Sequence, residues 1–277
     1  MPFNWAELFA NERHVISRHL IDPELAAGLA AFPPFEELSA ETLPQMRAMM
    51  SELARVQIAE TPRDGVTFTQ ETVPGPSGAP GVRVLLYRPA NANALTPAFL
   101  HIHGGGLVLG SPEIRHASSI HISSRFGCLV LSVDYRLAPE TQFPGAIEDC
   151  YAALSWLHQN ASALGVDRTR IVIGGESAGG GIAAALAILA RDRGDIPLAY
   201  QLLIYPMLDD RTCVTSDHPH VGHFVWTQAN NRFGWNSYLG HPPGGEDVGA
   251  YSAAARCDDL AGLPRRRLSR SVPGRGH

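Results

Sequence analysis

Lysine is absent from this chain of 277 residues, and all 22 basic residues are arginine. The last 13 residues contain five of those arginines and no acidic residue. Residues 1–264 therefore have a net charge of about −10, whereas the whole chain has −5. An acidic body of this kind offers no basic surface for nucleic acid, and we expect no nucleic-acid partner.

Cysteine is scarce, and its positions exclude several classes of protein. The four cysteines lie far apart and form no CxxC pair; they are Cys128, Cys150, Cys213 and Cys257. Neither a zinc ribbon nor a dense disulfide framework fits this spacing, so we expect reduced thiols and a cytoplasmic location. We interpret Cys128, in a predicted strand, as a small buried hydrophobic residue.

Long apolar runs are missing as well. The longest, Ala178 to Ala190, is too short to span a bilayer, which needs about 20 residues. The first 14 residues contain Glu7, Glu12 and Arg13 and lack the apolar centre of a signal peptide. We therefore expect no membrane span and no secretion signal. A hydrophobic content of 45% still excludes wholesale disorder, and the length suits one domain with a small appendage.

Short apolar runs alternate with helical patterns from about residue 66 onward. We predict strands at Thr67–Thr72, Val82–Tyr87, Ala98–His103, Cys128–Asp134, Arg170–Gly174 and Tyr200–Tyr205, and helices at Leu43–Ile58, Ala146–Asn160, Ala178–Arg193 and Thr227–Leu239. Two hairpin-like strands followed by a β-α-β-α-β series indicate an α/β fold with a mainly parallel sheet.

The strongest motif is Gly174-Gly175-Glu176-Ser177-Ala178-Gly179-Gly180-Gly181, between a predicted strand and a predicted helix. Its core, Gly175-x-Ser177-x-Gly179, has the spacing of a nucleophile elbow. Small residues are needed two places on either side of the serine, because strand and helix approach each other closely there. A structural glycine-rich turn or a phosphate-binding loop would use similar glycines, but the strand–turn–helix context favours a nucleophile.

A second motif, His101-Ile102-His103-Gly104-Gly105-Gly106, comes at the end of an earlier predicted strand. Three successive glycines let backbone amides approach a ligand without side chains in the way, which suits an oxyanion hole. The alternative is a flexible loop. Both motifs in one chain make coincidence improbable.

In combination these motifs resemble the hormone-sensitive-lipase-like branch of α/β-hydrolase carboxylesterases. The resemblance rests on His103–Ser111, Asp134–Glu140, Gly174–Gly180 and Leu203–Asp210, and it covers residues from roughly 20 to 264. It implies an α/β-hydrolase fold: an eight-stranded, mostly parallel sheet with helices on both faces and a helical cap. It also implies hydrolysis of short-chain carboxylic esters without cofactor or metal.

The resemblance assigns roles to individual residues. Ser177 would be the nucleophile and would form an acyl-enzyme intermediate. The amides that would hold the oxyanion are those of Gly105, Gly106 and Ala178, and the residues that would shape their loop are His103 and Gly104. The residues that would be structural are Asp134, Arg136, Glu140 and, as a hydrogen-bond partner, Glu176.

Two motifs of the family are not found, so neither the triad acid nor the triad histidine is identifiable. The family places them after two further strands, in the chain order serine, acid, histidine. After Leu260–Pro264, however, the sequence turns into Arg, Ser, Pro and Gly. Since GC-rich DNA read out of frame gives this composition, we hypothesise a frameshift or a premature natural end at about residue 264. The last strands would then be missing and the activity impaired.

Other residues could be considered as substitutes. Asp209 and Asp210 follow a predicted strand, but the motif match makes them structural. The histidines after Ser177 follow no predicted strand; they are His218, His220, His223, His241 and His277. The spacing His218-x-His220-x-x-His223, with Asp217, invites a zinc site, but Pro219 and the loop context favour a cap loop, and we predict no metal.

The expected organisation has four parts. They are an N-terminal helical cap segment (1–60), an α/β-hydrolase core (61–206 and 241–264), a second cap segment (207–240) and an aberrant arginine-rich tail (265–277). The expected partner is a small ester, and an exposed edge at Tyr200–Tyr205 would favour self-association. Two alternatives to an esterase stay open: a non-catalytic small-ligand-binding protein on the same fold, and an acyltransferase or amidase that uses Ser177.

Overall fold

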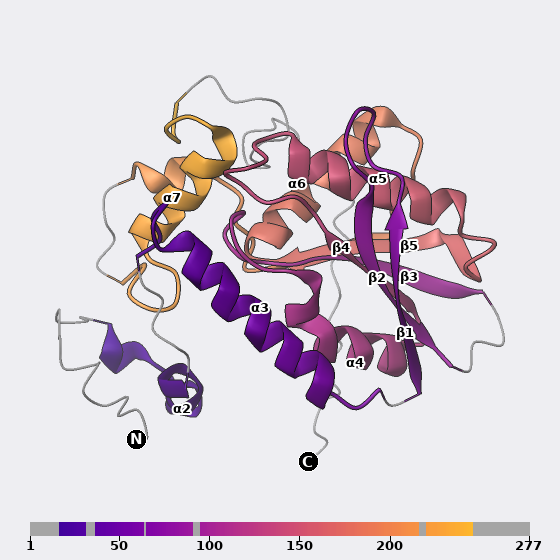
Figure 1. Cartoon of the computed structure of the whole chain (residues 1–277), viewed down its shortest axis with the longest axis horizontal. Coiled ribbons are helices and arrows are strands. Elements are labelled where there is room, and N and C mark those ends of the chain that lie inside the picture. The colour runs from indigo at the N-terminus through magenta and orange to yellow at the C-terminus, as the bar shows by residue number, and fades with distance from the viewer. Residues whose placement is uncertain (1–16, 32–36, 64, 91–94, 216–219, 246–277) are drawn as a thin grey trace, which may run out of the picture.

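The computed structural model describes residues 17–31, 37–63, 65–90, 95–215 and 220–245. Within them, six strands form one sheet in the order β1-β2-β4-β3-β5-β6 (Figure 1). Their bounds are Val66–Val73 (β1), Val82–Pro89 (β2), Thr96–Ile102 (β3), Leu129–Asp134 (β4), Val166–Glu176 (β5) and Tyr200–Ile204 (β6). β2 is antiparallel to both β1 and β4, and all other neighbouring strands are parallel. The predicted mainly parallel sheet is confirmed.

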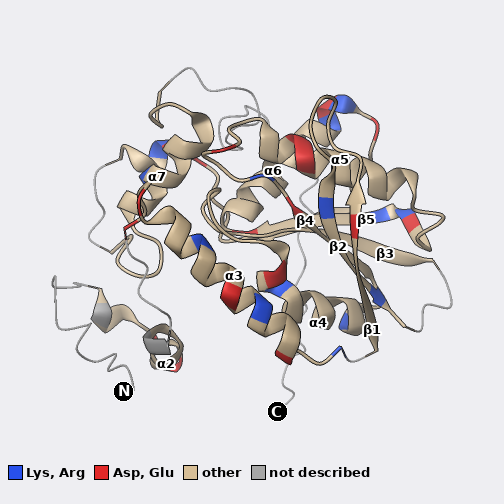
Figure 2. Cartoon of the chain, viewed as in Figure 1, with Lys and Arg blue, Asp and Glu red and all other residues tan. Residues whose placement is uncertain are grey.

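Helices lie on both faces of this sheet. Their bounds are Pro23–Ala31 (α2), Leu43–Glu60 (α3), His116–Phe126 (α4), Gly145–Gln159 (α5), Ala178–Arg193 (α6) and Gln228–Leu239 (α7), and the short 3-10 helices are Arg18–Leu20 (η1), Pro112–Arg115 (η2) and Asp210–Cys213 (η3). In Figure 1, α5 and α6 lie on the opposite side of the sheet from α4. α3 begins near α7 and runs obliquely past the sheet, and Figure 2 shows that it carries charges of both signs along its length.

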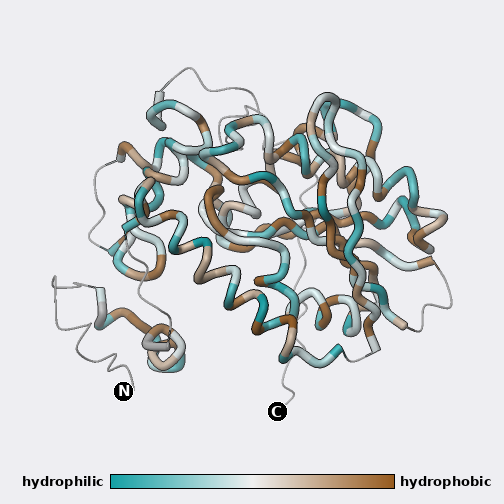
Figure 3. The backbone as a smooth tube through the Cα atoms, in the orientation of Figure 1, coloured by the Kyte–Doolittle hydropathy of each residue, from teal (hydrophilic) through white to brown (hydrophobic). Residues whose placement is uncertain are grey.

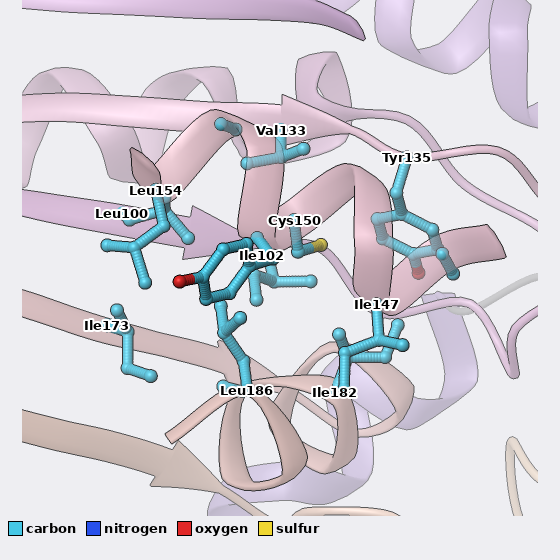
Figure 4. Close-up of a cluster of buried hydrophobic side chains, with 14 of the residues drawn as sticks. Leu100, Ile102, Val133, Tyr135, Ile147, Cys150, Leu154, Ile173, Ile182 and Leu186 are labelled. Carbon is cyan, nitrogen blue, oxygen red and sulfur yellow. The ribbon is translucent and has the colours of Figure 1, made fainter. Parts of the chain in front are cut away.

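The alternation of side chains along a strand explains why both faces are covered. Leu100 and Ile102 of β3 belong to the large core cluster, which also contains Ile182 and Leu186 of α6 (Figure 4). Phe99, directly before Leu100 in sequence, belongs to a second cluster on the face that α4 covers. Hydrophobic segments accordingly gather at the centre of the molecule, where β3, β4 and β5 lie (Figure 3).

Helix α4 is the main element that the sequence analysis missed. Its inward positions include Ser119 and Ser123, which are buried although they are polar, so the segment shows no apolar stripe. The Ser123 hydroxyl donates to the carbonyl of Tyr87 at 3.2 Å, which satisfies it inside the protein. A smaller correction concerns Cys128: it is buried as predicted, but it lies one residue before β4.

Strand β6 is the outermost strand of the described sheet and pairs with β5. Tyr200, Leu202 and Ile204 alternate along it, so they share one face, and their exposed fractions are 42%, 44% and 36%. The remaining predicted core segment from residue 246 to 264 and the arginine-rich tail lie outside the described residues. Among the residues described, none of the helices combines the length and the hydrophobicity that crossing a bilayer would take.

Candidate active site

Ser177 forms the apex of a sharp turn between β5 and α6. β5 ends at Glu176 and α6 begins at Ala178, so a single residue joins strand and helix. Its backbone has φ 54° and ψ −119°, a conformation that a non-glycine residue adopts at a cost of about 1–3 kcal/mol. Ser177 stays partly exposed while both neighbours are buried. The turn therefore presents the hydroxyl to solvent beside the positive end of a helix.

The glycines on either side of Ser177 are required by the close approach of three backbone segments. A Cβ atom added to Gly175 would lie 2.7 Å from the carbonyl carbon of Gly179 and would overlap the carbonyl oxygen of Ile102. A Cβ atom added to Gly179 would lie 2.5 Å from the carbonyl oxygen of His103. Real Cβ atoms do not come this close to backbone atoms, so neither position accepts a side chain.

The glycine loop lies next to Ser177, at the carboxyl ends of β3 and β5. A Cβ atom added to Gly104 would lie 3.5 Å from the Cβ of Ser177. Gly105 and Gly106 have φ values of 130° and 61°, which turn the chain through conformations that side chains rarely permit. At the start of α6, the amide of Ala178 has no intrahelical acceptor. The structure thus brings the three predicted oxyanion-binding residues to one end of the sheet.

His103 is a neutral, fully buried part of the glycine loop. Burial lowers the pKa of His103 to about 4, so the ring carries no charge at neutral pH. Its Nδ1 lies 2.8 Å from the carbonyl oxygen of Gly104 and can donate to it, and its ring stacks on Tyr135 with the centroids 4.3 Å apart. The Tyr135 hydroxyl donates to the His103 carbonyl at 2.9 Å. These contacts suit a residue that shapes the loop.

The carboxylate of Glu176, the residue directly before Ser177, bonds to one residue that precedes the glycine loop in sequence and to one that follows it. Its Oε2 lies 3.0 Å from His101 Nε2, and its Oε1 lies 2.8 Å from Arg115 Nη2. Burial would raise the pKa of Glu176, but the hydrogen bond from His101 and the charge of Arg115 outweigh it, and the pKa is lowered. His101 also bonds to Ser132 Oγ at 2.8 Å through its Nδ1. Glu176 therefore ties the nucleophile turn to the residues before and after the loop.

The other three residues that the resemblance makes structural all have ionic partners. The pairs are Asp134 with Arg83, Arg136 with Asp149, and Glu140 with Arg47. Arg47 belongs to α3 and also donates to the carbonyl oxygens of Val108 and Ala138, at 2.9 and 2.8 Å. The segment that follows the glycine loop is thereby fastened to α3, which lies in the predicted N-terminal cap segment.

The described histidines that follow Ser177 have hydrogen-bond partners in other places. His220 Nδ1 and His223 Nδ1 lie 3.1 and 2.9 Å from the hydroxyl of Ser17. His241 Nδ1 lies 3.0 Å from the carbonyl oxygen of Pro242. The two other candidate histidines, His218 and His277, lie outside the described residues, as does Asp217.

The two candidate acids, Asp209 and Asp210, each accept a hydrogen bond from a backbone amide of a neighbouring loop or turn. Asp209 accepts from the amide of Arg211 at the start of η3 and forms an ion pair with the same residue. Asp210 is buried and accepts from the amide of Gly244 at 2.6 Å. In the part of the chain that the structure describes, no three His, Cys, Asp or Glu residues are grouped so that they could hold a metal ion.

Arg115 and Ser132 belong to this site although the sequence analysis did not select them. They lie in η2 and β4 and meet Glu176 and His101 only through the fold. No local motif marks them.

Comparison with known proteins gives consistent matches. A family described as having an alpha/beta hydrolase fold matches residues 99–267. Esterase LipI of Mycobacterium tuberculosis (strain ATCC 25618 / H37Rv) is 38% identical over 159 residues, which are 56% of this chain and 50% of that protein. Carboxylesterase NlhH of M. tuberculosis (strain CDC 1551 / Oshkosh) is 37% identical over 194 residues, 69% of this chain and 58% of that protein. The chain thus spans little more than half the length of these relatives.

Solved structures extend the likeness to most of the chain. A bacterial heroin esterase superposes with a TM-score of 0.80 and 40% identity, covering 88% of this chain and 77% of that one. An esterase from Pyrobaculum calidifontis superposes with a TM-score of 0.72 and 32% identity, covering 86% and 76%.

Proposed function

This chain belongs to the α/β-hydrolase fold family, in its hormone-sensitive-lipase-like branch, and on that premise we propose that it hydrolyses carboxylic esters with Ser177 as the nucleophile. One observation carries the proposal. The strained turn holds Ser177 at the carboxyl end of β5, and Gly104 lies against it. A hydroxyl and a row of backbone amides around one point are what acyl transfer requires.

The reaction would follow the usual course of a serine hydrolase. The Ser177 oxygen attacks the ester carbonyl carbon, and its proton passes to a base and then to the leaving alcohol. The amides of Gly105, Gly106 and Ala178 would stabilise the negative oxygen of the tetrahedral intermediate. Water then hydrolyses the acyl-enzyme and releases the carboxylic acid. His103 would not be the base, because it is buried and bonded within the loop.

The proposed substrates are esters with short acyl groups. α3 and α7 belong to the two predicted cap segments, and Arg47 of α3 is bonded to the backbone behind the glycine loop. A site with such a cover has little room for a long chain.

We further propose that the chain turns esters over slowly. His220, His223 and His241 are bonded elsewhere, and the family's acid and histidine motifs are absent from the sequence. Serine hydrolases that lack triad members keep about 10³–10⁴-fold catalysis over water, far below full activity. The same observation favours a second candidate function, the binding of a small ligand without turnover.

Hydrolysis of p-nitrophenyl butanoate tests the proposal. The Ser177→Ala variant should lose the activity above background, whereas Ser51→Ala, at an exposed position of α3, should keep it. Equal turnover by the chain and by Ser177→Ala would contradict an esterase that uses this serine. Saturable butanoate binding without turnover would instead support the binding function. Formation of the butanoate ester of an added alcohol would indicate acyl transfer.

We also propose self-association through the edge of β6. Tyr200, Leu202 and Ile204 place exposed apolar side chains on a strand that pairs with β5 alone among the described strands. Such edges pair readily with other chains, and a lysine discourages this. Leu202→Lys should lower the mass measured by light scattering, while Leu53→Lys, on exposed α3, should leave it unchanged. An equal mass for both variants would contradict this proposal.

The proposed location is the cytoplasm. Cys128, Cys150 and Cys213 are all buried and free of disulfides, as is usual in a reducing compartment.

A further inference from the structure

The indole of Trp226 packs directly on the glycine loop. A Cβ atom added to Gly106 would overlap the six-membered ring of this indole, so the ring occupies the place where a side chain of residue 106 would begin. Gly234 of α7 completes the contact: a Cβ atom added there would lie 2.5 Å from the Gly106 carbonyl oxygen and 3.5 Å from Trp226 Cζ2. The second cap segment therefore touches the loop that would bind the oxyanion.

The orientation of this indole is fixed. Its Nε1 donates to Asn231 Oδ1 at 3.3 Å, and Asn231 Nδ2 donates to Thr212 Oγ1 at 3.1 Å. Asn231 lies on α7 and is itself bonded to Thr212 of η3, so the partner that holds the ring is fixed in turn. A side chain held in this way can act as a rigid wall.

The backbone that presents Trp226 is strained. Val225 has φ 58°, which is an outlier for a β-branched residue, and the amide of Trp226 donates to the carbonyl of Phe224 at 2.6 Å. Such strain persists only where the surroundings over-determine it, and it is common at ligand sites. The strained turn thus supports a role in binding for Trp226.

The wall stands close to the nucleophile. Gly104 touches Ser177, and Gly106 is two residues further on, at most about 7.6 Å away because consecutive Cα atoms lie about 3.8 Å apart. An ester whose carbonyl oxygen is bound by the loop amides would therefore have its acyl chain beginning near the segment on which the ring packs.

We infer that the indole of Trp226 is the wall that limits the acyl chain, so that the site takes acetyl to butanoyl groups and excludes octanoyl groups. This inference rests on the proposed ester hydrolysis at Ser177. It adds a specificity-determining residue: the ring fills the space beside the oxyanion loop into which a longer chain would extend. Being apolar, it also favours an uncharged alkyl group over a charged one.

Hydrolysis of p-nitrophenyl butanoate and octanoate tests the inference, with Trp226→Ala and Trp226→Phe compared with the unchanged protein. Removing a wall that excludes several methylenes should raise the octanoate-to-butanoate ratio of kcat/KM at least tenfold, because one methylene in a pocket is worth about 10–200-fold. Trp226→Phe should give a smaller rise. Trp156→Phe is the matched control: Trp156 packs on the core from α5 and should leave the ratio unchanged.

Binding without turnover separates this inference from the proposed activity. In the Ser177→Ala background, calorimetry with butanoate and octanoate should show that Trp226→Phe strengthens octanoate binding relative to butanoate. If no ester is hydrolysed but this shift is seen, the wall is supported and the esterase proposal fails. If esters are hydrolysed and neither Trp226 variant changes the ratio more than Trp156→Phe does, the wall is overturned. A Trp226→Ala variant that fails to fold leaves the decision to Trp226→Phe, whose unchanged circular dichroism can be checked first.

Discussion

Replacing the buried carboxylate beside the nucleophile, in a Glu176→Gln variant, should destabilise the protein far more than replacing a surface carboxylate. Glu176 is 7% exposed and is bonded to His101 and Arg115. Glutamine fills the same volume, but it has no charge, and it turns an NH₂ group toward one of two donors. One buried donor then loses its acceptor.

The magnitude follows from the two contacts. A buried hydrogen bond to a charged group contributes about 1.5–3 kcal/mol. The Arg115 side chain is 38% exposed, so solvent screens its ion pair and limits it to about 1 kcal/mol. Loss of both contacts should lower the unfolding free energy of the variant by about 3 kcal/mol. This corresponds to a fall in Tm of roughly 5–10 °C in a chain of this size.

The loss should also depend on pH, because the pKa of Glu176 is lowered in the folded protein. A carboxyl group with a lowered pKa stabilises the fold above its unfolded pKa of about 4.3, and this stabilisation disappears as pH falls through the folded pKa. The difference between the two proteins should therefore be full at pH 7 and shrink below about pH 4.

Urea unfolding of Glu176→Gln and Glu148→Gln at pH 7 and at about pH 3, below the unfolded pKa of a glutamate, checks this prediction. Glu148 pairs with Arg193 on the surface, where both side chains are about one third exposed, so its variant should lose at most about 1 kcal/mol. Equal losses for the two variants, or a Glu176 loss that is the same at both pH values, would refute the reasoning.

Two further predictions test the geometry of the glycines and the state of the buried histidine. Gly179→Ala should abolish or severely weaken folding, because its Cβ would meet the Ile102 and His103 carbonyl groups. Gly28→Ala is the control: in α2 its Cβ would meet open space, and the free energy of unfolding should rise by up to about 1 kcal/mol. Melting curves of the two variants, followed by circular dichroism, would contradict this if their midpoints were similar. Burial lowers the pKa of His103 to about 4, below its unfolded value of about 6.5. The stabilisation that comes from keeping this ring neutral is therefore full above pH 6.5 and is lost as pH falls toward 4. The unfolding free energy of the unchanged protein should therefore fall by about 2 kcal/mol more than that of His103→Asn between pH 7 and pH 5, and a constant difference in urea titrations would count against a neutral His103.

Much of the fold could be predicted because its strands and helices are apolar in the expected periods. α6 was predicted from Ala178 to Arg193 and has those bounds, since its apolar run is continuous and Gly194 ends it in the left-handed conformation. α4 was not predicted because two serines occupy inward positions. Ser123 bonds to the carbonyl of Tyr87, which is distant in sequence. Because such a partner is present only in the folded protein, the local sequence pattern does not predict that the serine is buried.

The candidate site likewise contains residues that the sequence predicts and residues that it does not. Ser177 and the glycine loop could be predicted because the spacing of their glycines is a local requirement of a tight turn. Arg115 and Trp226 could not, because they approach the site from other parts of the chain and carry no motif of their own. Their positions depend on the order of strands in the sheet and on the path of the chain between η3 and α7.

Backbone strain connects these separate parts of the chain. The described non-glycine residues with positive φ are Leu107, Ser177, Tyr205 and Val225. Leu107 directly follows the glycine loop, Val225 directly precedes Trp226, and Tyr205 follows Ile204, whose carbonyl accepts from the amide of Ser177 at 3.0 Å. Each such conformation costs about 1–3 kcal/mol, so four of them are comparable with the whole stability of a domain, about 5–15 kcal/mol. The core under α5 and α6 has to offset that cost, and the strain falls on Ser177, on the residue after the glycine loop, and on the residues next to Ile204 and Trp226. A fold that needed only stability would relax these turns, so their concentration here supports a site at which the backbone geometry itself is used.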